Sequence, residues 1–121
     1  MNYTIGEFAR LTGLSIDTLR YYEKEALIKP ERNTRNQRVF TEKDVQWVRF
    51  ILRLKQIGMP IKEMKTYAKL REEGDDTIVE RIELLYQQQQ SLHEQKAVIE
   101  NHLNFLSQKI ETYQEMLKNN A

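Results

Sequence analysis

The sequence predicts a mainly α-helical protein in two parts, a compact N-terminal head and one long C-terminal coiled-coil helix. Capping residues and glycines divide residues 1–74 into several short helices. A basic, polar stretch at residues 31–40 interrupts these helices and has the composition of a small hairpin. Residues 75–118 contain no glycine or proline and repeat apolar side chains every seven positions, which predicts a dimerisation coiled coil.

Composition limits the classes of protein that this chain can represent. Its 121 residues are enough for one compact domain and an extension. No apolar run approaches the roughly 20 residues of a transmembrane helix, and the N-terminus lacks a secretion signal. We therefore expect a cytoplasmic protein without a membrane partner. The absence of cysteine excludes disulfides and thiolate metal sites.

Charge is distributed unevenly along the chain. Residues 1–71 contain 15 Lys and Arg against 8 Asp and Glu, a net charge of +7. Residues 72–121 contain 4 Lys and Arg against 10 Asp and Glu, a net charge of −6. A basic first part is typical of a protein whose head meets a polyanion such as nucleic acid, although an ordinary uneven surface gives the same numbers.

The first predicted helix begins after Thr4. Thr4 and Glu7 have the spacing of a capping box, and Gly13 permits a tight turn after the helix. The apolar positions that would form its buried side are Ile5, Phe8, Ala9 and Leu11.

A second short helix follows, with Ser15 as its N-cap residue. Ile16, Leu19 and Tyr22 recur at helical spacing and would face inward. The side chains left on the open faces, which can reach phosphates or base edges, are Asp17, Thr18, Arg20, Tyr21 and Lys24. Two short helices over residues 5–24 joined by a glycine-containing turn predict a helix-turn-helix, a pattern shared with helical hairpins that do not bind DNA.

Residues 31–40 predict a small hairpin that would act as a wing beside the helices. Val39 and Phe40 have strand propensity, and the asparagine-rich stretch before them favours a turn. In this interpretation Arg35 and Arg38 project toward phosphates. A solvated basic loop remains the alternative.

Two further helices complete the predicted head. Thr41 caps the first of them, which ends at Gly58, and the second runs from Pro60 to Gly74. Their predicted apolar sides are Val45, Trp47, Val48, Ile51 and Leu52 in the first, and Ile61, Met64, Tyr67, Ala68 and Leu70 in the second.

The long C-terminal helix carries an apolar seam over six heptads, about 60 Å at 1.5 Å per residue. A head of about 75 residues cannot bury a stripe of this length, so self-association follows. Gln89 and Lys96 interrupt the seam, where polar residues either fix the register or mark a point at which the strands separate. The predicted dimerisation residues are Ile78, Ile82, Leu85, Leu92, Ile99, Leu103, Leu106, Ile110, Tyr113 and Leu117.

Catalytic and metal-binding patterns are missing from the sequence. His93 and His102 lie nine residues apart, about two and a half helical turns, and therefore on opposite sides of one helix. The glycines are isolated, so no phosphate-binding loop is present. We predict no enzymatic activity, no metal site and no cofactor.

Several segments together resemble the MerR family of bacterial transcription regulators. They are Thr4-Ile5-Gly6-Glu7-Phe8-Ala9, Leu19-Arg20-Tyr21-Tyr22-Glu23, Leu27-Ile28-Lys29-Pro30, Arg38-Val39-Phe40 and Gly58-Met59. The resemblance implies a winged helix-turn-helix head, an antiparallel coiled-coil homodimer and a promoter DNA target. It also implies that the protein bends and untwists double-stranded promoter DNA so that RNA polymerase can engage.

The resemblance also assigns roles to individual residues. Ser15, Asp17, Thr18, Arg20 and Tyr21 would face the major groove or its flanking phosphates, and Arg35, Asn36 and Arg38 would form the wing contacts; Thr4 and Lys24 complete the predicted DNA-binding set. Ala26 stands where a glycine is usual, which predicts a slightly longer second helix. Metal- and redox-sensing relatives use cysteines, and aldehyde-responsive relatives use one near Leu52 or Arg53, so thiol sensing does not carry over to this chain.

Three functions from different classes follow from these observations. The first is a sequence-specific transcription regulator on an inverted-repeat operator. The second is an architectural DNA-bending protein without sequence preference, whose binding would depend steeply on salt. The third is a coiled-coil adaptor with no DNA role, which leaves Arg20, Tyr21 and Arg38 unexplained.

Overall fold

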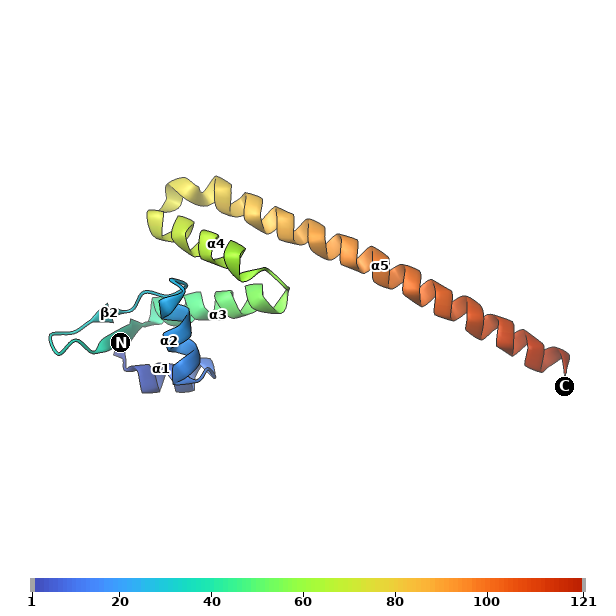
Figure 1. The fold of residues 1–121 in the computed structure, drawn as a ribbon, viewed down its shortest axis with the longest axis horizontal. Coiled ribbons are helices and arrows are strands. Elements are labelled where there is room, and N and C mark those ends of the chain that lie inside the picture. The colour runs from blue at the N-terminus through green and yellow to red at the C-terminus, as the bar shows by residue number, and fades with distance from the viewer. Residues whose placement is uncertain (1, 121) are drawn as a thin grey trace. The chain divides into compact units, whose positions relative to one another are not determined.

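The computed structural model describes residues 2–120 and divides them into two compact units. The first, here called the head, extends to Leu85, and the second, here called the distal helix, begins at Tyr86. The head therefore extends beyond residue 74, where the sequence predicts a boundary. In chain order the elements are β1 (Asn2–Tyr3), α1 (Ile5–Thr12), α2 (Ile16–Lys24), β2 (Glu31–Arg32), β3 (Arg38–Thr41), α3 (Glu42–Gln56), α4 (Ile61–Glu73), a 3-10 turn (Asp75–Thr77) and α5 (Ile78–Asn119) (Figure 1).

The three short strands form an antiparallel sheet in the order β1-β3-β2. β2 and β3 form the predicted hairpin, with Arg32 paired to Arg38 in the register. The Asn33 side-chain oxygen closes the turn by accepting hydrogen bonds from the backbone N–H groups of Arg35 at 2.9 Å and Gln37 at 3.0 Å. This arrangement confirms the winged helix-turn-helix that the sequence predicts for the head.

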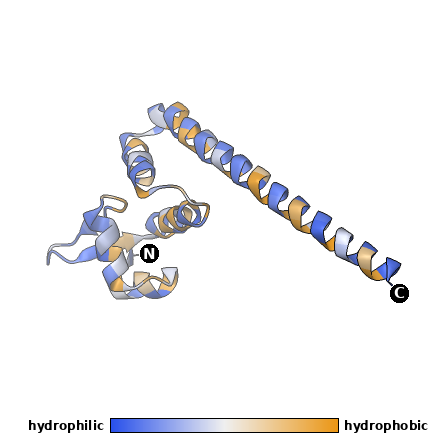
Figure 2. Cartoon of the chain, turned by 45° about the vertical axis from the view of Figure 1, so that its right-hand side comes forward, coloured by the Kyte–Doolittle hydropathy of each residue, from blue (hydrophilic) through white to orange (hydrophobic). Residues whose placement is uncertain are grey.

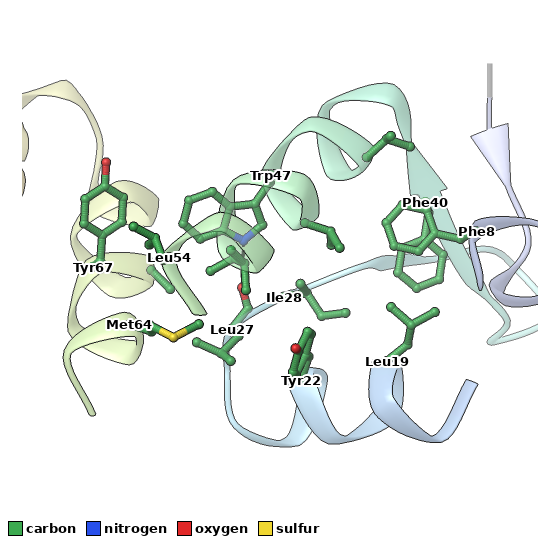
Figure 3. Packing of buried hydrophobic residues seen from close by; sticks show 14 of the residues in the cluster. Phe8, Leu19, Tyr22, Leu27, Ile28, Phe40, Trp47, Leu54, Met64 and Tyr67 are labelled. Atoms are coloured by element: carbon green, nitrogen blue, oxygen red, sulfur yellow. Dashed lines mark hydrogen bonds between the residues drawn. The ribbon is translucent and has the colours of Figure 1, made fainter. Parts of the chain in front are cut away.

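One apolar core holds the head together. Phe8 of α1 stacks on Phe40 of β3 with ring centroids 4.1 Å apart, which fastens the first helix to the sheet (Figure 3). The Trp47 indole N–H donates a 2.7 Å hydrogen bond to the Leu27 carbonyl and so anchors the loop that follows α2. The buried members of this core are Phe8, Leu19, Tyr22, Leu27, Ile28, Phe40, Val45, Trp47, Val48, Ile51, Leu54, Met59, Met64, Tyr67 and Ala68.

The predicted helix caps are confirmed where the contacts are local. Thr4 and Glu7 form the capping box of α1, Ser15 caps α2, and Thr41 caps α3 through Asp44. The turn between α1 and α2 needs a left-handed residue, and Gly13 supplies it at φ 74°.

The prediction that Leu11, Ile16 and Ile61 are buried is wrong. Their exposed fractions are 44%, 37% and 42%. Leu11 lies in the last turn of α1, and the two isoleucines are the first residues of α2 and α4. Helical spacing places them on the apolar side, but these short helices extend past the edge of the small core.

The prediction of a longer second helix is also wrong. α2 ends at Lys24, and Ala26 adopts a left-handed conformation with φ 60°. The Leu27 N–H then donates to the Tyr22 carbonyl at 2.9 Å, which reverses the chain. Leu27 and Ile28 are buried directly after this reversal. Their burial therefore outweighs the preference of alanine for a right-handed conformation.

α5 is a continuous helix of 42 residues. Hydrophobic residues recur along its length among hydrophilic ones (Figure 2). Leu85 is half-buried against the core of the head. The other predicted seam residues are exposed: Ile78, Ile82, Leu92, Ile99, Leu103, Leu106, Ile110, Tyr113 and Leu117. Across residues 2–120, no helix combines the length and apolar character that crossing a membrane requires.

Candidate nucleic-acid interface

Four of the five residues predicted on the open face of α2 are exposed, namely Asp17, Arg20, Tyr21 and Lys24, whereas Thr18 is half-buried. The side chain of Ser15 forms its hydrogen bonds within α2: its oxygen accepts from the Thr18 N–H at 3.0 Å, and its hydroxyl donates to the Thr18 hydroxyl at 2.9 Å. Asp17 and Arg20 form only a loose 4.0 Å ion pair in solvent. Arg20 therefore remains able to present its planar set of N–H donors to phosphates or to the edge of guanine.

Buried neighbours fix this face in orientation. Leu19 and Tyr22 are buried in the core, whereas Arg20, Tyr21 and Lys24 between and after them are exposed. Each exposed residue is thus attached to a helix that cannot rotate without opening the core. Such support gives a recognition helix the defined geometry that base-edge contacts need.

The structure adds a cation that the sequence analysis does not identify. Lys55, near the end of α3, lines a pocket of about 280 Å³ together with Tyr21 of α2 and Met59 and Ile61 of the following segment. Lys55 is exposed and extends the basic character of the α2 face. The sequence gives no signal for it, because Tyr21 and Lys55 are far apart in the chain and line one pocket only in the folded protein.

The end of α2 carries an ion pair to α4. The Lys65 ammonium donates to the Glu25 carboxylate at 2.9 Å. This contact lowers the pKa of Glu25, and the same carboxylate raises the pKa of Lys65. Glu25 therefore pairs with a residue of α4 and not with the wing.

Two of the three residues predicted to form wing contacts are exposed, and the third is partly buried. Arg35 and Asn36 are exposed in the turn between β2 and β3. Arg38, predicted to project toward phosphates, donates from its Nε to Glu23 Oε1 at 2.7 Å, and its side chain is 23% exposed, so its contact with DNA stays a prediction. This ion pair forms because the fold brings Arg38 of β3 to the last turn of α2, where the carboxylate of Glu23 lies.

Thr4 lies in a groove between the start of α1 and the wing, with a volume of about 600 Å³. Asn36 and Arg38 line the same groove, so the structure brings these three predicted residues together. The Thr4 N–H donates to the Glu7 carboxylate at 2.9 Å, which lowers the pKa of Glu7. Beside it, the Tyr3 hydroxyl donates to Glu42 at 3.0 Å, and this bond raises the pKa of Tyr3.

The described part of the chain offers no cluster of three or more His, Asp or Glu side chains that could hold a metal ion. The predicted contact residues of α2 and the wing supply hydrogen-bond donors and cations. Arginine, lysine, tyrosine and asparagine side chains on a helix and an adjacent hairpin suit a phosphate backbone with base edges beside it.

Comparison with known proteins gives consistent matches over most of the chain. Residues 3–70 match the family described as MerR HTH family regulatory protein, and residues 45–100 match the one described as MerR, DNA binding. An HTH-type transcriptional regulator of Haemophilus influenzae is 38% identical over 115 residues, which cover 94% of this chain and 85% of the relative. The HTH-type transcriptional regulator YyaN of Bacillus subtilis is 31% identical over 129 residues, which cover 96% and 94%.

Solved structures show the same similarity. The crystal structure of HiNmlR, a MerR family regulator lacking the sensor domain, bound to promoter DNA, is 38% identical and has a TM-score of 0.76; the match covers 95% of this chain and 92% of that one. A MerR family transcriptional regulator from Bacillus thuringiensis is 36% identical with a TM-score of 0.72, over 93% of this chain and 99% of that one.

Proposed function

The chain belongs to the MerR family of helix-turn-helix regulatory proteins, and from that premise we propose that it is a DNA-binding transcription regulator whose head binds promoter DNA. The observation that carries this proposal is the exposed polar face of α2, where Arg20 and Tyr21 are held in orientation by the buried Leu19 and Tyr22. The relative HiNmlR, whose match covers nearly the whole chain, is bound to promoter DNA in its crystal structure. An enzymatic activity forms no part of this proposal.

The protein acts as a homodimer through α5. Its exposed apolar seam has heptad spacing, and a second copy of the chain offers the same seam in return. In keeping with the family, the two helices run antiparallel. The partner that covers the seam is thus another copy, and the two heads are held at a fixed separation.

The DNA target of this dimer is an inverted-repeat operator in promoter DNA. Two identical heads related by a two-fold axis read two identical half-sites, so the spacing between half-sites matters. The dimer bends and untwists the DNA between promoter elements, which changes how RNA polymerase engages them. This deformation costs several kcal/mol, which the contacts of the helix and the wing offset. The protein carries out this function in the cytoplasm, at the nucleoid.

Two substitutions on α2 test the assignment of the recognition helix. Arg20→Ala and Tyr21→Ala should each weaken operator binding by about 1–3 kcal/mol while the protein remains folded and dimeric. Lys118→Ala, in the exposed end of α5, removes the same charge as Arg20→Ala and should change affinity little. Titration of each variant against the duplex that the wild-type protein protects in a footprint measures the effect. If all three variants bind the duplex with the affinity of the wild-type protein, α2 is not the recognition helix.

Promoter geometry tests the mechanism. Deleting one or two base pairs between the promoter elements should abolish activation or convert it to repression, while footprinting still shows a bound protein. Activation that does not respond to spacer length would exclude DNA distortion. A protein that protects every duplex equally, with binding governed by salt alone, would instead be an architectural DNA-bending protein.

A further inference from the structure

One carboxylate connects α2 to both strands of the wing. Glu23, in the last turn of α2, accepts a 2.7 Å hydrogen bond from Arg38 Nε at its Oε1 atom. Its other oxygen, Oε2, accepts from Arg32 Nη2 at 3.3 Å. The side chains of Glu23 and Arg38 are each only 23% exposed, so solvent screens this pair less than an ordinary surface ion pair.

The two arginines need such a counter-ion because of their register. Arg32 of β2 and Arg38 of β3 are directly paired across the antiparallel hairpin. Like charges in this relation destabilise a strand pair. Glu23 gives one oxygen to each guanidinium, so a residue of α2 removes a repulsion that is internal to the wing. Closure of the hairpin and its attachment to α2 thereby depend on the same side chain.

The contacts continue from Glu23 to the turn of the wing. Arg32, held by Glu23 through one terminal nitrogen, donates from its other nitrogen to the Asn36 carbonyl at 3.3 Å. Asn36 has φ 60°, and it follows Arg35, whose side chain is exposed. A continuous series of hydrogen bonds therefore runs from α2 to the residue beside the exposed cation of the wing.

We propose that Glu23 is the positioning residue that fixes the wing against the recognition helix, so that Arg35 and the α2 face meet DNA at one defined separation. This inference rests on the proposed function. Glu23 is itself a carboxylate and would repel phosphates, so its contribution to binding is indirect. Holding the wing in its bound conformation before association increases affinity only for DNA that fits that conformation. Glu23 thus supports selectivity between sequences more than affinity for DNA in general.

Glu25 provides a matched control two residues away. Glu23→Gln and Glu25→Gln remove the same charge from neighbouring positions, but Glu25 bonds Lys65 of α4 and not the wing. Each variant is titrated against a duplex selected from random sequences by the wild-type protein, and against a scrambled duplex of the same length. Dissociation constants are measured over a series of salt concentrations, and circular dichroism with thermal unfolding checks that each variant is folded.

Glu23→Gln should weaken binding to the selected duplex by about tenfold, the size of one partly exposed charge-assisted hydrogen bond. Binding to the scrambled duplex should not weaken, and its salt dependence should steepen because Arg32 and Arg38 become free to contact phosphates. Glu25→Gln should leave the ratio of the two affinities unchanged. If both variants change the two duplexes in parallel, Glu23 acts only through its charge and the positioning role is wrong.

A double substitution separates positioning from a general loss of structure. Arg38→Gln should lower the selectivity ratio on its own, and adding Glu23→Gln to it should lower the ratio less than twofold further, because the shorter of the two Glu23 contacts is already broken and only the 3.3 Å contact with Arg32 remains to be lost. Independent, additive losses would contradict a role for Glu23 through Arg38. If the wild-type protein selects no preferred duplex, the proposed function fails, and that result is distinct from failure of the positioning role.

Discussion

The head and the distal helix both have apolar residues at helical spacing, but these residues are buried in the head and exposed in the distal helix. In the head, Phe8, Val48 and Ile51 are fully buried against one another and their neighbours. In the distal helix, Ile99 and Leu106 stand at regular heptad positions and are 57% and 53% exposed. The head thus completes its core within one chain, whereas the apolar heptad positions of the distal helix remain exposed, which suits the proposed homodimer.

This difference follows from element length. The helices of the head are short, between 8 and 15 residues, and caps turn the chain so that their apolar sides meet. α5 is 42 residues long and has no internal glycine or proline at which the chain could fold back. Substitutions in the two regions should therefore act on different properties, namely folding of the head and association of the chains.

The largest expected effect is on the core of the head. Phe8→Ala removes a fully buried ring that stacks on Phe40, and should lower the free energy of unfolding by about 3–5 kcal/mol. Thermal unfolding followed by tryptophan fluorescence reports on the head, because Trp47 belongs to its core. Leu11→Ala, at an exposed apolar position of the same helix, should cost far less. Comparable losses for the two variants would contradict the packing described for α1.

A charge in the seam should affect association instead. Ile99→Asp places a carboxylate in the proposed interface and should weaken dimerisation by about 3 kcal/mol or more, since a desolvated, unpaired charge is costly. Asn101→Asp adds the same charge outside the seam and should leave the dimer intact. Sedimentation equilibrium distinguishes the two. An unaffected dimer in the Ile99→Asp variant would place the interface elsewhere.

A polar contact of the core should have an intermediate effect. Trp47→Phe keeps an aromatic ring but leaves the Leu27 carbonyl without the indole N–H that lies 2.7 Å away. The loss of a buried hydrogen bond should destabilise the head by about 2 kcal/mol. Because Leu27 lies in the loop after α2, amide hydrogen exchange should also accelerate around residues 26–28. Unchanged exchange there would show that the loop is held by packing alone.

The sequence predicts those parts of the head that depend on residues close together in the chain. The capping box of Thr4 and Glu7 needs only residues three positions apart, and the long helix α5 needs only a run without glycine or proline, so both could be predicted directly; the role of its seam in dimerisation stays a prediction. The hairpin followed from strand and turn propensities in one decapeptide. These features are local, and local rules are sufficient for them.

The parts that the sequence does not predict depend on tertiary contacts. The partner of Arg38 is one such contact, because an arginine in a basic hairpin has no visible counter-ion in the sequence until the fold brings it to Glu23 of α2. Lys55 joins the candidate interface only in the folded protein, where it lines one pocket with Tyr21 of α2. The same reasoning explains Ala26, whose conformation is imposed by the burial of the residues after it.

Ala26 provides the smallest expected effect and the most direct contrast between the two regions. At φ 60° an L-residue is strained by roughly 1–2 kcal/mol, which glycine does not experience. Glycine is also more flexible in the unfolded chain, which cancels part of this gain. Ala26→Gly should therefore stabilise the head by about 0.5–1 kcal/mol, measured by urea unfolding with Trp47 fluorescence.

The same substitution at Ala97, an exposed position within α5, should destabilise that helix by about 1 kcal/mol. The backbone there is right-handed, so glycine relieves no strain and only increases the conformational entropy that is lost on folding. One substitution should thus change stability with opposite sign in the head and in the distal helix. If Ala26→Gly destabilises the head, strain at this left-handed position is smaller than the entropy that glycine loses on folding, and the strain assigned to Ala26 is wrong.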